Sequence, residues 1–383
     1  MTPPARGFPI GEFKGRTQRA QDMMRAAGLS ALLLTTEPEV RYYTGFLTRF
    51  WESPTRPWFV VVPSEGDPIA VIPAIGVHLM SQTWIKDIRT WDAPNYTDDG
   101  IGQLAGTLCN VTDEHARIGL AHAMESHARL PLGSLEGVRR QIGKRQITSD
   151  HEITRRLRMI KSDTEIAKIR YAADIANRAF ERVPDIARTG EALSAIFRHF
   201  QMLCLDEGAD WVPYLAGAAS QGGYADVISP ATDAPVAAGD VLMLDTGVVW
   251  DGYFCDFDRN FSIGMPSQHV EAAHEKLITA TEAALAVAHP GRRISELYHA
   301  MDAHLKLGRN AGRLGHGLGM QLTEWPSVLP DDQTVLRPGM VLTIEPYVAM
   351  GDGKIMVHEE NIVICETSAE YLSRPATPKI PSL

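Results

Sequence analysis

Cysteine is scarce in this sequence, and its few cysteines lie far apart. Four cysteines occur among 383 residues, and none of them forms a Cys-x-x-Cys pair. Zinc knuckles and redox-active dithiols need such pairs, and disulfide-stabilised mini-folds need a much higher density of cysteine. The sequence therefore indicates neither class, and it predicts a cytoplasmic protein with reduced thiols. These residues are Cys109, Cys204, Cys255 and Cys365.

Long apolar runs and an excess of positive charge are also missing. No apolar run is long enough to cross a bilayer, and the first residues lack the apolar core of a secretory signal. The 37 Lys and Arg residues are outnumbered by 47 Asp and Glu, which gives a formal net charge of −10. Such a surface repels nucleic acid and anionic membranes, so we expect neither as a partner.

The length of the chain predicts two domains, because 383 residues exceed what one ordinary hydrophobic core supports. Residues 1–152 alternate between helical patterns and short apolar runs, which predicts an α/β N-terminal domain. The second domain is expected over residues 153–383. Ser162 and Glu165 form a capping-box pattern at the start of a long amphipathic helix, and β-rich stretches at 212–262 and 341–365 predict an α+β domain.

The segment from 241 to 259 carries the strongest chemical signal. Asp251 and Gly252 form an Asp-Gly pair between two β-rich runs, which predicts a two-residue hairpin turn. This turn would place Asp245 opposite Asp258 and would direct both, together with Asp256, to one face of the hairpin. Converging carboxylates repel one another unless a cation or a proton neutralises them. The segment predicts either a divalent-metal site or a solvated acidic face, and the apolar run before Asp245 favours the buried metal site.

Three further segments each contain one potential metal ligand. His316 lies between glycines, Glu345 follows the apolar run 341–344, and Glu359 lies within another strand pattern. Flanking glycines leave an imidazole accessible, and a carboxylate at the end of a buried strand is costly without a partner. Each residue alone also has an ordinary explanation, because a single histidine is more often a core or surface residue than a ligand.

The order and spacing of these segments resemble the pita-bread metalloenzymes, which include prolidase, aminopeptidase P, methionine aminopeptidase and creatinase. The resemblance covers residues 153–366, and the gap between Glu345 and Glu359 is closest to the prolidase branch. Residues 1–152 resemble the small N-terminal domain of prolidases and creatinases, on less specific motifs. The expected fold is therefore a creatinase-like α/β N-terminal domain followed by a pita-bread catalytic domain.

The resemblance implies a role for each candidate residue. Asp245 would bind a first divalent metal ion, Asp256 and Glu359 would bridge two ions, and His316 and Glu345 would complete the second. Manganese, cobalt, zinc or iron would suit such a mixed ligand set. A hydroxide between the metals would cleave an amide C–N bond, and Glu345 would pass a proton to the leaving group. The resemblance also implies a homodimer and a dipeptide or other small-molecule substrate.

The sequence departs from the peptidase pattern at two catalytic positions. Tyr224 and Thr323 stand where peptidases of this family have histidines that bind substrate and stabilise the oxyanion. Asp258 stands where the family has a small hydroxyl residue. We therefore expect weak activity on Xaa-Pro dipeptides and a better substrate that is small and polar or zwitterionic. Tyr224 would be its hydrogen-bond donor, and Asp258 would favour a cationic group.

Other interpretations stay open at this stage. A non-peptidase on the same scaffold could be a creatinase-like or ectoine-hydrolase-like enzyme, or a dimethylsulfoniopropionate lyase, to which the run Glu324-Trp325-Pro326 is similar. A binding module without catalysis would not need all the metal ligands. The stretch from Arg49 to Trp51 has two interpretations, a core aromatic cluster with surface arginines or a segment that reaches an active site.

Overall fold

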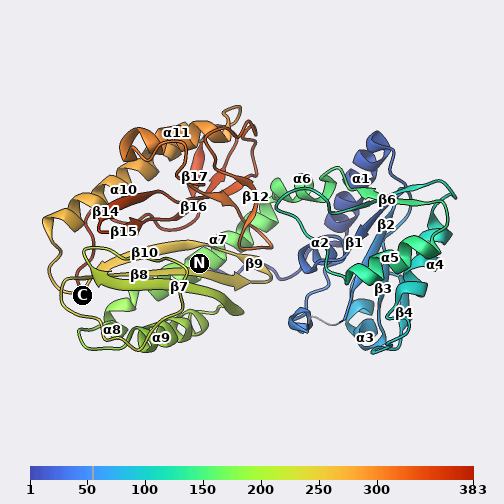
Figure 1. Cartoon of the computed structure of the whole chain (residues 1–383), viewed down its shortest axis with the longest axis horizontal. Helices are drawn as coiled ribbons and strands as arrows, with labels where there is room; N and C mark the ends of the chain where they lie inside the picture. Colours follow the sequence, from blue (N-terminus) through green and yellow to red (C-terminus); the bar gives the residue numbers. More distant parts are fainter. Residues whose placement is uncertain (54–55) are drawn as a thin grey trace. The chain divides into compact units, whose positions relative to one another are not determined.

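The computed structural model describes residues 1–53 and 56–383, which form two compact units (Figure 1). The N-terminal unit comprises residues 5–158, and the C-terminal unit comprises residues 1–4 and 159–383. The boundary expected between residues 152 and 153 precedes helix α6 (Ile153–Met159), most of which the structure groups with the N-terminal unit. In the described part of the chain, no helix is both long and apolar enough to cross a membrane.

The N-terminal unit is a mixed sheet with helices packed against it. The strands follow the order β4-β3-β2-β1-β5-β6, in which β1 pairs antiparallel with β2 and parallel with β5. The strands β1, β2 and β3 are buried along their whole length, as expected for a sheet between layers of helices. The elements are β1 (Ala31–Leu34), β2 (Phe59–Pro63), β3 (Ile69–Pro73), β4 (Asp87–Trp91), β5 (Arg117–Leu120), β6 (Gln146–Ser149), α1 (Ile10–Ala27), α2 (Glu37–Thr44), α3 (Val77–Ser81), α4 (Ile101–Val111) and α5 (Leu132–Gln141).

An aromatic cluster lies beside the segment whose role the sequence left open. Trp51 is 8% exposed and packs on Trp58, with ring centroids 5.9 Å apart. Arg129 stacks over Trp51 and donates hydrogen bonds to the carbonyl oxygens of Trp51 and Ser53. Arg49, in contrast, is exposed and pairs with Glu52. These contacts agree with the interpretation as a core cluster flanked by surface arginines.

The C-terminal unit consists of antiparallel sheets that carry helices on their outer faces (Figure 1). One sheet has the order β10-β8-β7, and the other has the order β12-β11-β13-β16-β17, while β14 and β15 form a separate hairpin. Helices α7 and α9 share a core with the first sheet, and α10 and α11 share a core with the second. The elements are β7 (Trp211–Gln221), β8 (Asp240–Trp250), β9 (Tyr253–Phe254), β10 (Phe257–Ser262), β11 (His316–Gly317), β12 (Glu324–Ser327), β13 (Val341–Ile344), β14 (Tyr347–Gly351), β15 (Lys354–Val357), β16 (Glu360–Ile364), β17 (Ala369–Tyr371), α7 (Asp163–Glu181), α8 (Val183–Ile186), α9 (Leu193–Asp206), α10 (Gln268–Val287) and α11 (Ile294–Leu305).

The hairpin between β8 and β9 has the predicted turn and register. Asp251 and Gly252 have φ values of 47° and 76°, as a two-residue turn of this kind requires. The turn continues into the pairing of β8 with β10, where Asp258 lies directly opposite Asp245. The capping box predicted at the start of α7 is also present, with Ser162 as the N-cap. Both predictions are confirmed.

Candidate metal centre

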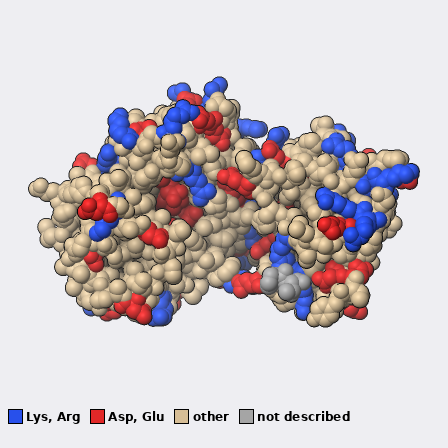
Figure 2. Space-filling view, viewed as in Figure 1, with Lys and Arg blue, Asp and Glu red and all other residues tan. Residues whose placement is uncertain are grey.

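The predicted ligands lie on or beside strands of both sheets in the C-terminal unit. Asp245 lies within β8, and Asp256 lies in the break between β9 and β10. His316 begins β11, Glu345 directly follows β13, and Glu359 lies between β15 and β16. Figure 2 shows a group of acidic side chains in a recess of this unit, in the region where Figure 1 places β16. The fold thus brings strand positions that are far apart in sequence toward one region.

Asp256, His316 and Glu359 form the tightest group. One potential ligand atom from each lies within 4.8 Å of the others, and all three residues are buried. The Nε2 atom of His316 is 3.5 Å from Asp256 Oδ2 and 4.0 Å from Glu359 Oε1. The longer separation is beyond hydrogen-bonding range, and both suit atoms that share a cation.

His316 lies between two glycines, and the structure has no room for a side chain at either of these neighbouring positions. A Cβ atom at Gly315 would lie 2.3 Å from the carbonyl oxygen of Thr343, and one at Gly317 would lie 2.7 Å from that of Trp325. His316 Nδ1 is 2.9 Å from the carbonyl oxygen of Gly317. Because that oxygen only accepts, Nδ1 carries the hydrogen and the lone pair of Nε2 faces the carboxylates. Burial is the main cause that lowers the pKa of His316 to about 4, so the ring is neutral, as a ligand must be.

The carboxylates of the group are strongly perturbed. Burial raises the pKa values of Asp245, Asp256 and Glu359 well above their usual range, and the charges of neighbouring carboxylates raise them further. Burial also raises the pKa of Glu345 to about 7, although the charge of Arg313 acts against this rise. The charge of Arg313 likewise lowers the pKa of Asp256. Arg313 itself is exposed, so a cationic side chain lies close to the acidic group and in contact with solvent.

The donor set fits a bound metal. Asp245 Oδ1, Asp256 Oδ1 and Glu359 Oε1 are buried and have no hydrogen-bond partner among the described residues. A buried carboxylate oxygen without a donor is costly, so the cluster needs either protons or cations. Oxygen and imidazole ligands together suit divalent ions such as manganese, iron, cobalt and zinc.

Two contacts around the ligands were missed by the sequence reasoning. The hydroxyl of Tyr214 on β7 donates a 3.0 Å hydrogen bond to Asp245 Oδ2. Asn361 on β16 accepts a 3.0 Å hydrogen bond from the backbone N–H of Asp256, and its side-chain amide donates one to the carbonyl oxygen of Asp256. These two hydrogen bonds hold the main chain where the pairing of β8 is interrupted. In sequence, Tyr214 is an ordinary aromatic strand residue, and the only signal for Asn361 was its place in the strand pattern of Glu359.

Tyr224 requires a correction. It is 1% exposed, and its hydroxyl donates to Asn260 Oδ1 at 3.0 Å and accepts from the backbone N–H of Val357 at 2.8 Å. A tyrosine hydroxyl has one hydrogen, and here that hydrogen is directed at Asn260. The structure therefore does not support Tyr224 as a hydrogen-bond donor to a substrate, and it gives this residue a role in joining β10 to the end of β15.

Thr323 and Glu324 lie at the start of β12. Thr323 precedes the strand and is partly exposed, and its side chain makes no hydrogen bond within the described part of the chain. Glu324 pairs with Lys161 at 3.2 Å and accepts hydrogen bonds from the backbone N–H groups of Met320 and Gln321. The acid of the Glu-Trp-Pro run thus closes the turn between β11 and β12. These contacts give Glu324 a structural role.

Comparison with known proteins places the chain in a family. Residues 167–367 match metallopeptidase family M24, and residues 16–160 match the creatinase/prolidase N-terminal domain. The chain belongs to family M24 and has the pita-bread catalytic fold together with the creatinase-type N-terminal domain. The resemblance and the fold class inferred from the sequence are confirmed, and so is the expectation of an enzyme from a metal-dependent family.

The individual relatives are peptidases by name. A probable dipeptidase, PepE, of Mycobacterium bovis is 27% identical over 368 residues, which cover 94% of each protein. An Xaa-Pro dipeptidase of Pyrococcus horikoshii is 27% identical over 252 residues, which cover 64% of this chain and 71% of that protein. The crystal structure of dipeptidase PepE from Mycobacterium ulcerans matches 98% of this chain and 99% of its own with a TM-score of 0.84 and 23% identity. The crystal structure of the prolidase from Pyrococcus horikoshii matches 96% of this chain and 100% of its own, with a TM-score of 0.81 and 22% identity.

Proposed function

We propose that this protein is a dinuclear metal-dependent hydrolase that cleaves an amide C–N bond in a small substrate with a free carboxylate. One observation carries the proposal. Buried carboxylate oxygens of Asp245, Asp256 and Glu359 have no partner among the described residues, and the lone pair of His316 faces two of these side chains. Such a set is costly unless it holds cations.

Each residue of the set has a proposed role. Asp245 would hold a first ion, Asp256 and Glu359 would be shared by two ions, and His316 and Glu345 would complete the second. When bound, two divalent ions polarise the amide carbonyl and make hydroxide available near neutral pH. Glu345 would receive the proton of the attacking water and deliver it to the leaving nitrogen, as a positioned carboxylate can.

The substrate side of the proposal rests on charge. Arg313 is exposed, and its positive charge acts on Asp256, His316 and Glu345. A guanidinium at such a place suits a carboxylate of the substrate, with which it forms paired hydrogen bonds. The relatives named as dipeptidases and as an Xaa-Pro dipeptidase support a peptide-like substrate of this kind.

The absent histidines favour a second candidate within the same chemistry. Thr323 carries no positive charge, and the hydrogen of Tyr224 is directed at Asn260. Removal of a single oxyanion donor costs about 10²–10³ in turnover. We therefore propose that Xaa-Pro dipeptides are poor substrates and that a better one is a small polar or zwitterionic molecule, of the kind whose C–N bond creatinase-like or ectoine-hydrolase-like enzymes cleave. A lyase reaction has less support, because Glu324 is engaged by Lys161 and the turn before β12.

A metal analysis followed by a substrate panel tests the proposal. Purified protein reconstituted with manganese, cobalt, zinc or iron should contain about two ions per chain. The panel compares Xaa-Pro dipeptides, their C-terminal amides, N-acyl amino acids and small zwitterionic amides. A free carboxylate should improve kcat/KM in every class. Protein that binds no metal would refute the metal site, and kcat/KM of about 10⁴ M⁻¹s⁻¹ or more on several Xaa-Pro dipeptides would identify an ordinary prolidase.

The assembly stays a prediction as well. The prolidase-like enzymes that the sequence resembles pair through contacts that include the small domain, so we propose a homodimer. Light scattering at micromolar concentration would test it, and a monomer would contradict it.

A further inference from the structure

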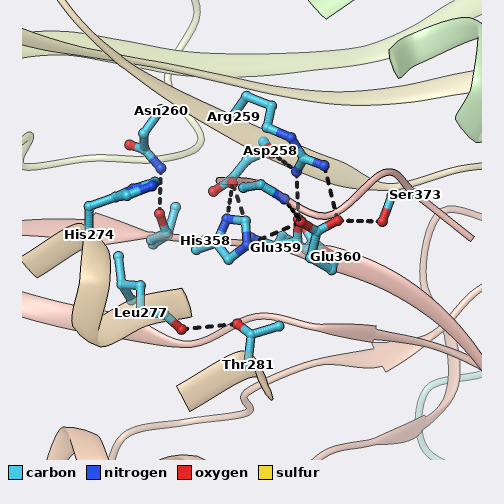
Figure 3. A network of polar contacts seen from close by, with 12 residues as sticks. Asp258, Arg259, Asn260, His274, Leu277, Thr281, His358, Glu359, Glu360 and Ser373 are labelled. Carbon is cyan, nitrogen blue, oxygen red and sulfur yellow. Dashed lines mark hydrogen bonds and ion pairs between the residues drawn. The ribbon is translucent and has the colours of Figure 1, made fainter. Parts of the chain in front are cut away.

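A buried network of charged side chains lies directly behind Glu359 (Figure 3). Asp258, His358 and Glu360 are each 1% exposed. His358 Nδ1 lies 3.3 Å from Asp258 Oδ1, and its Nε2 lies 3.3 Å from Glu360 Oε1. Carboxylate oxygens only accept, so both ring nitrogens donate and His358 is an imidazolium between two carboxylates. The network is therefore a row of alternating charges with little access to water.

The network holds the backbone of Glu359 at both of its polar groups. Asp258 Oδ1 accepts the N–H of Glu359 at 3.0 Å, in addition to the hydrogen from His358. The next residue, Arg259, donates from Nη1 to the carbonyl oxygen of Glu359 at 3.3 Å. Two consecutive residues of β10 thus fix the peptide groups on either side of Glu359. The direction in which its side chain leaves the chain depends on them.

Glu360 ties the far end of the network to the rest of the unit. It accepts from Arg259 Nη2 at 3.0 Å, from the Ser373 hydroxyl and from the backbone N–H of Ala376 at 2.8 Å. Burial acts to raise the pKa of Glu360, but the charge of Arg259 and the hydrogen bonds from His358 and Ser373 outweigh it and lower the pKa to about 2. Glu360 is therefore anchored by three groups besides His358, and His358 lies between the side chains of Asp258 and Glu360.

Burial of the Asp258 carboxylate beside the other acidic residues is energetically unfavourable unless other groups compensate it. Its register places it opposite Asp245, so it adds a carboxylate to a site that already contains several. Its charge raises the pKa of Asp245 further, after burial, and therefore opposes ionisation of a ligand. A buried carboxylate of this kind is tolerated when a cation and hydrogen bonds compensate it. Here His358 and the N–H of Glu359 do so at Oδ1, while Oδ2 is buried and has no hydrogen-bond partner among the described residues. The expectation that Asp258 favours a cationic group of a substrate stays a prediction, because both of these contacts are made by its Oδ1 atom.

We propose that Asp258 and His358 form a positioning pair that holds Glu359 in the orientation required of a metal ligand, and that the pair thereby sets the affinity of the centre for its metal. The inference rests on the proposed function, because it takes Glu359 as a ligand. Neither residue touches substrate in this proposal. Groups that orient metal ligands typically change metal affinity 10–100-fold when they are lost.

The test measures Co²⁺ binding by the metal-free full-length protein in competition with a chromogenic chelator, together with the visible absorption of bound Co²⁺. We expect Asp258→Ala to weaken Co²⁺ binding about 10–100-fold and to alter the Co²⁺ spectrum, because Glu359 loses its anchor. Asp258→Asn should weaken binding less, because the amide oxygen can still accept the N–H of Glu359. His358→Gln should resemble Asp258→Asn, because one of its two donors is kept.

Asp251→Asn is the matched control. Asp251 is another buried carboxylate of the same hairpin, and it pairs with the fully buried Lys168 at the turn. Its loss should lower the melting temperature but leave the Co²⁺ affinity and spectrum unchanged. The inference is wrong if Asp258→Ala binds Co²⁺ like the wild type, or if affinity falls equally in the control. If Asp258→Ala does not fold, wild-type affinity in both milder variants is the refuting result. Failure of the wild type to bind Co²⁺ would instead refute the proposed function.

Discussion

The ligand side and the substrate side of the site differ in how firmly the fold holds them. On the ligand side, Asp256 is held by Asn361, His316 is oriented by a carbonyl oxygen, and Glu359 is fixed by Asp258. On the substrate side, Thr323 makes no side-chain hydrogen bond within the described part of the chain. The contrast teaches that the two halves of this site are separable. The fold holds the proposed metal ligands in place, and we infer that the choice of substrate depends on a few side chains around them.

Loss of a bridging ligand should produce the largest effect. Asp256→Ala removes a carboxylate proposed to contact both ions, so both should be lost and activity should fall by at least about 10³-fold, more than the loss of one oxyanion donor costs. Asp245→Ala should retain more of the second ion, because Asp245 is proposed to contact only the first. Metal content by elemental analysis checks the difference. Equal metal loss in the two variants would show that the bridging assignment is wrong.

Substitution of two tyrosines, one beside a proposed ligand and one at the Asn260 contact, should produce smaller effects. Tyr214→Phe removes the hydroxyl that donates to Asp245, and a hydrogen bond to a charged group contributes about 1.5–3 kcal/mol, so metal affinity should fall about tenfold or more. Tyr224→Phe leaves Asn260 Oδ1 and the N–H of Val357 without this partner in a buried place, so it should cost about 1–3 kcal/mol of folding stability.

Chelator competition and denaturant unfolding, measured on both tyrosine variants, separate these outcomes. We expect Tyr214→Phe to affect mainly metal binding and Tyr224→Phe to affect mainly unfolding. If Tyr224→Phe instead lowered turnover with stability and metal content intact, the original expectation of a substrate donor would be restored.

The parts of this site that the sequence predicts are those carried by local patterns. The Asp-Gly turn sets the register that places Asp245 opposite Asp258, and a hairpin register follows from a few neighbouring residues. The glycines around His316 and the apolar run before Glu345 are equally local. The family resemblance then joined these segments, because their order along the chain is specific even where each segment alone is weak.

The parts that the sequence does not predict depend on contacts between distant strands. Tyr214 reaches Asp245 only because β7 pairs with β8 in a particular register. Asn361 lies on a strand of one sheet and Asp256 beside a strand of the other, and the sequence pattern of neither segment predicts the hydrogen bond between them. Tyr224 was misjudged for the same reason, because its partners Asn260 and Val357 lie on other strands. Side-chain partners of this kind need the tertiary structure.

The smallest predicted effect concerns the stability of the metal-free protein as pH rises. Burial raises the pKa of Asp256 well above its usual range, with the charges of Asp245 and Glu345 adding to the rise. A carboxyl whose pKa is higher in the folded than in the unfolded state gives its full stabilisation below the unfolded pKa and loses it as pH rises through the folded pKa. With chelator present, the free energy of unfolding should therefore fall above about pH 4. The Asp256→Asn side chain cannot ionise, so the free energy of unfolding of this variant should fall less with pH. The difference should be about 1.4 kcal/mol for each unit by which the pKa of Asp256 is higher in the folded than in the unfolded state.

With metal present the order of stability of the two proteins should reverse, because the wild type gains a ligand that the variant lacks. Denaturant unfolding across pH, with and without Mn²⁺, measures both signs. If the free energy of unfolding of both proteins depended on pH in the same way in chelator, the ionised Asp256 would not destabilise the metal-free protein, and the prediction would be wrong.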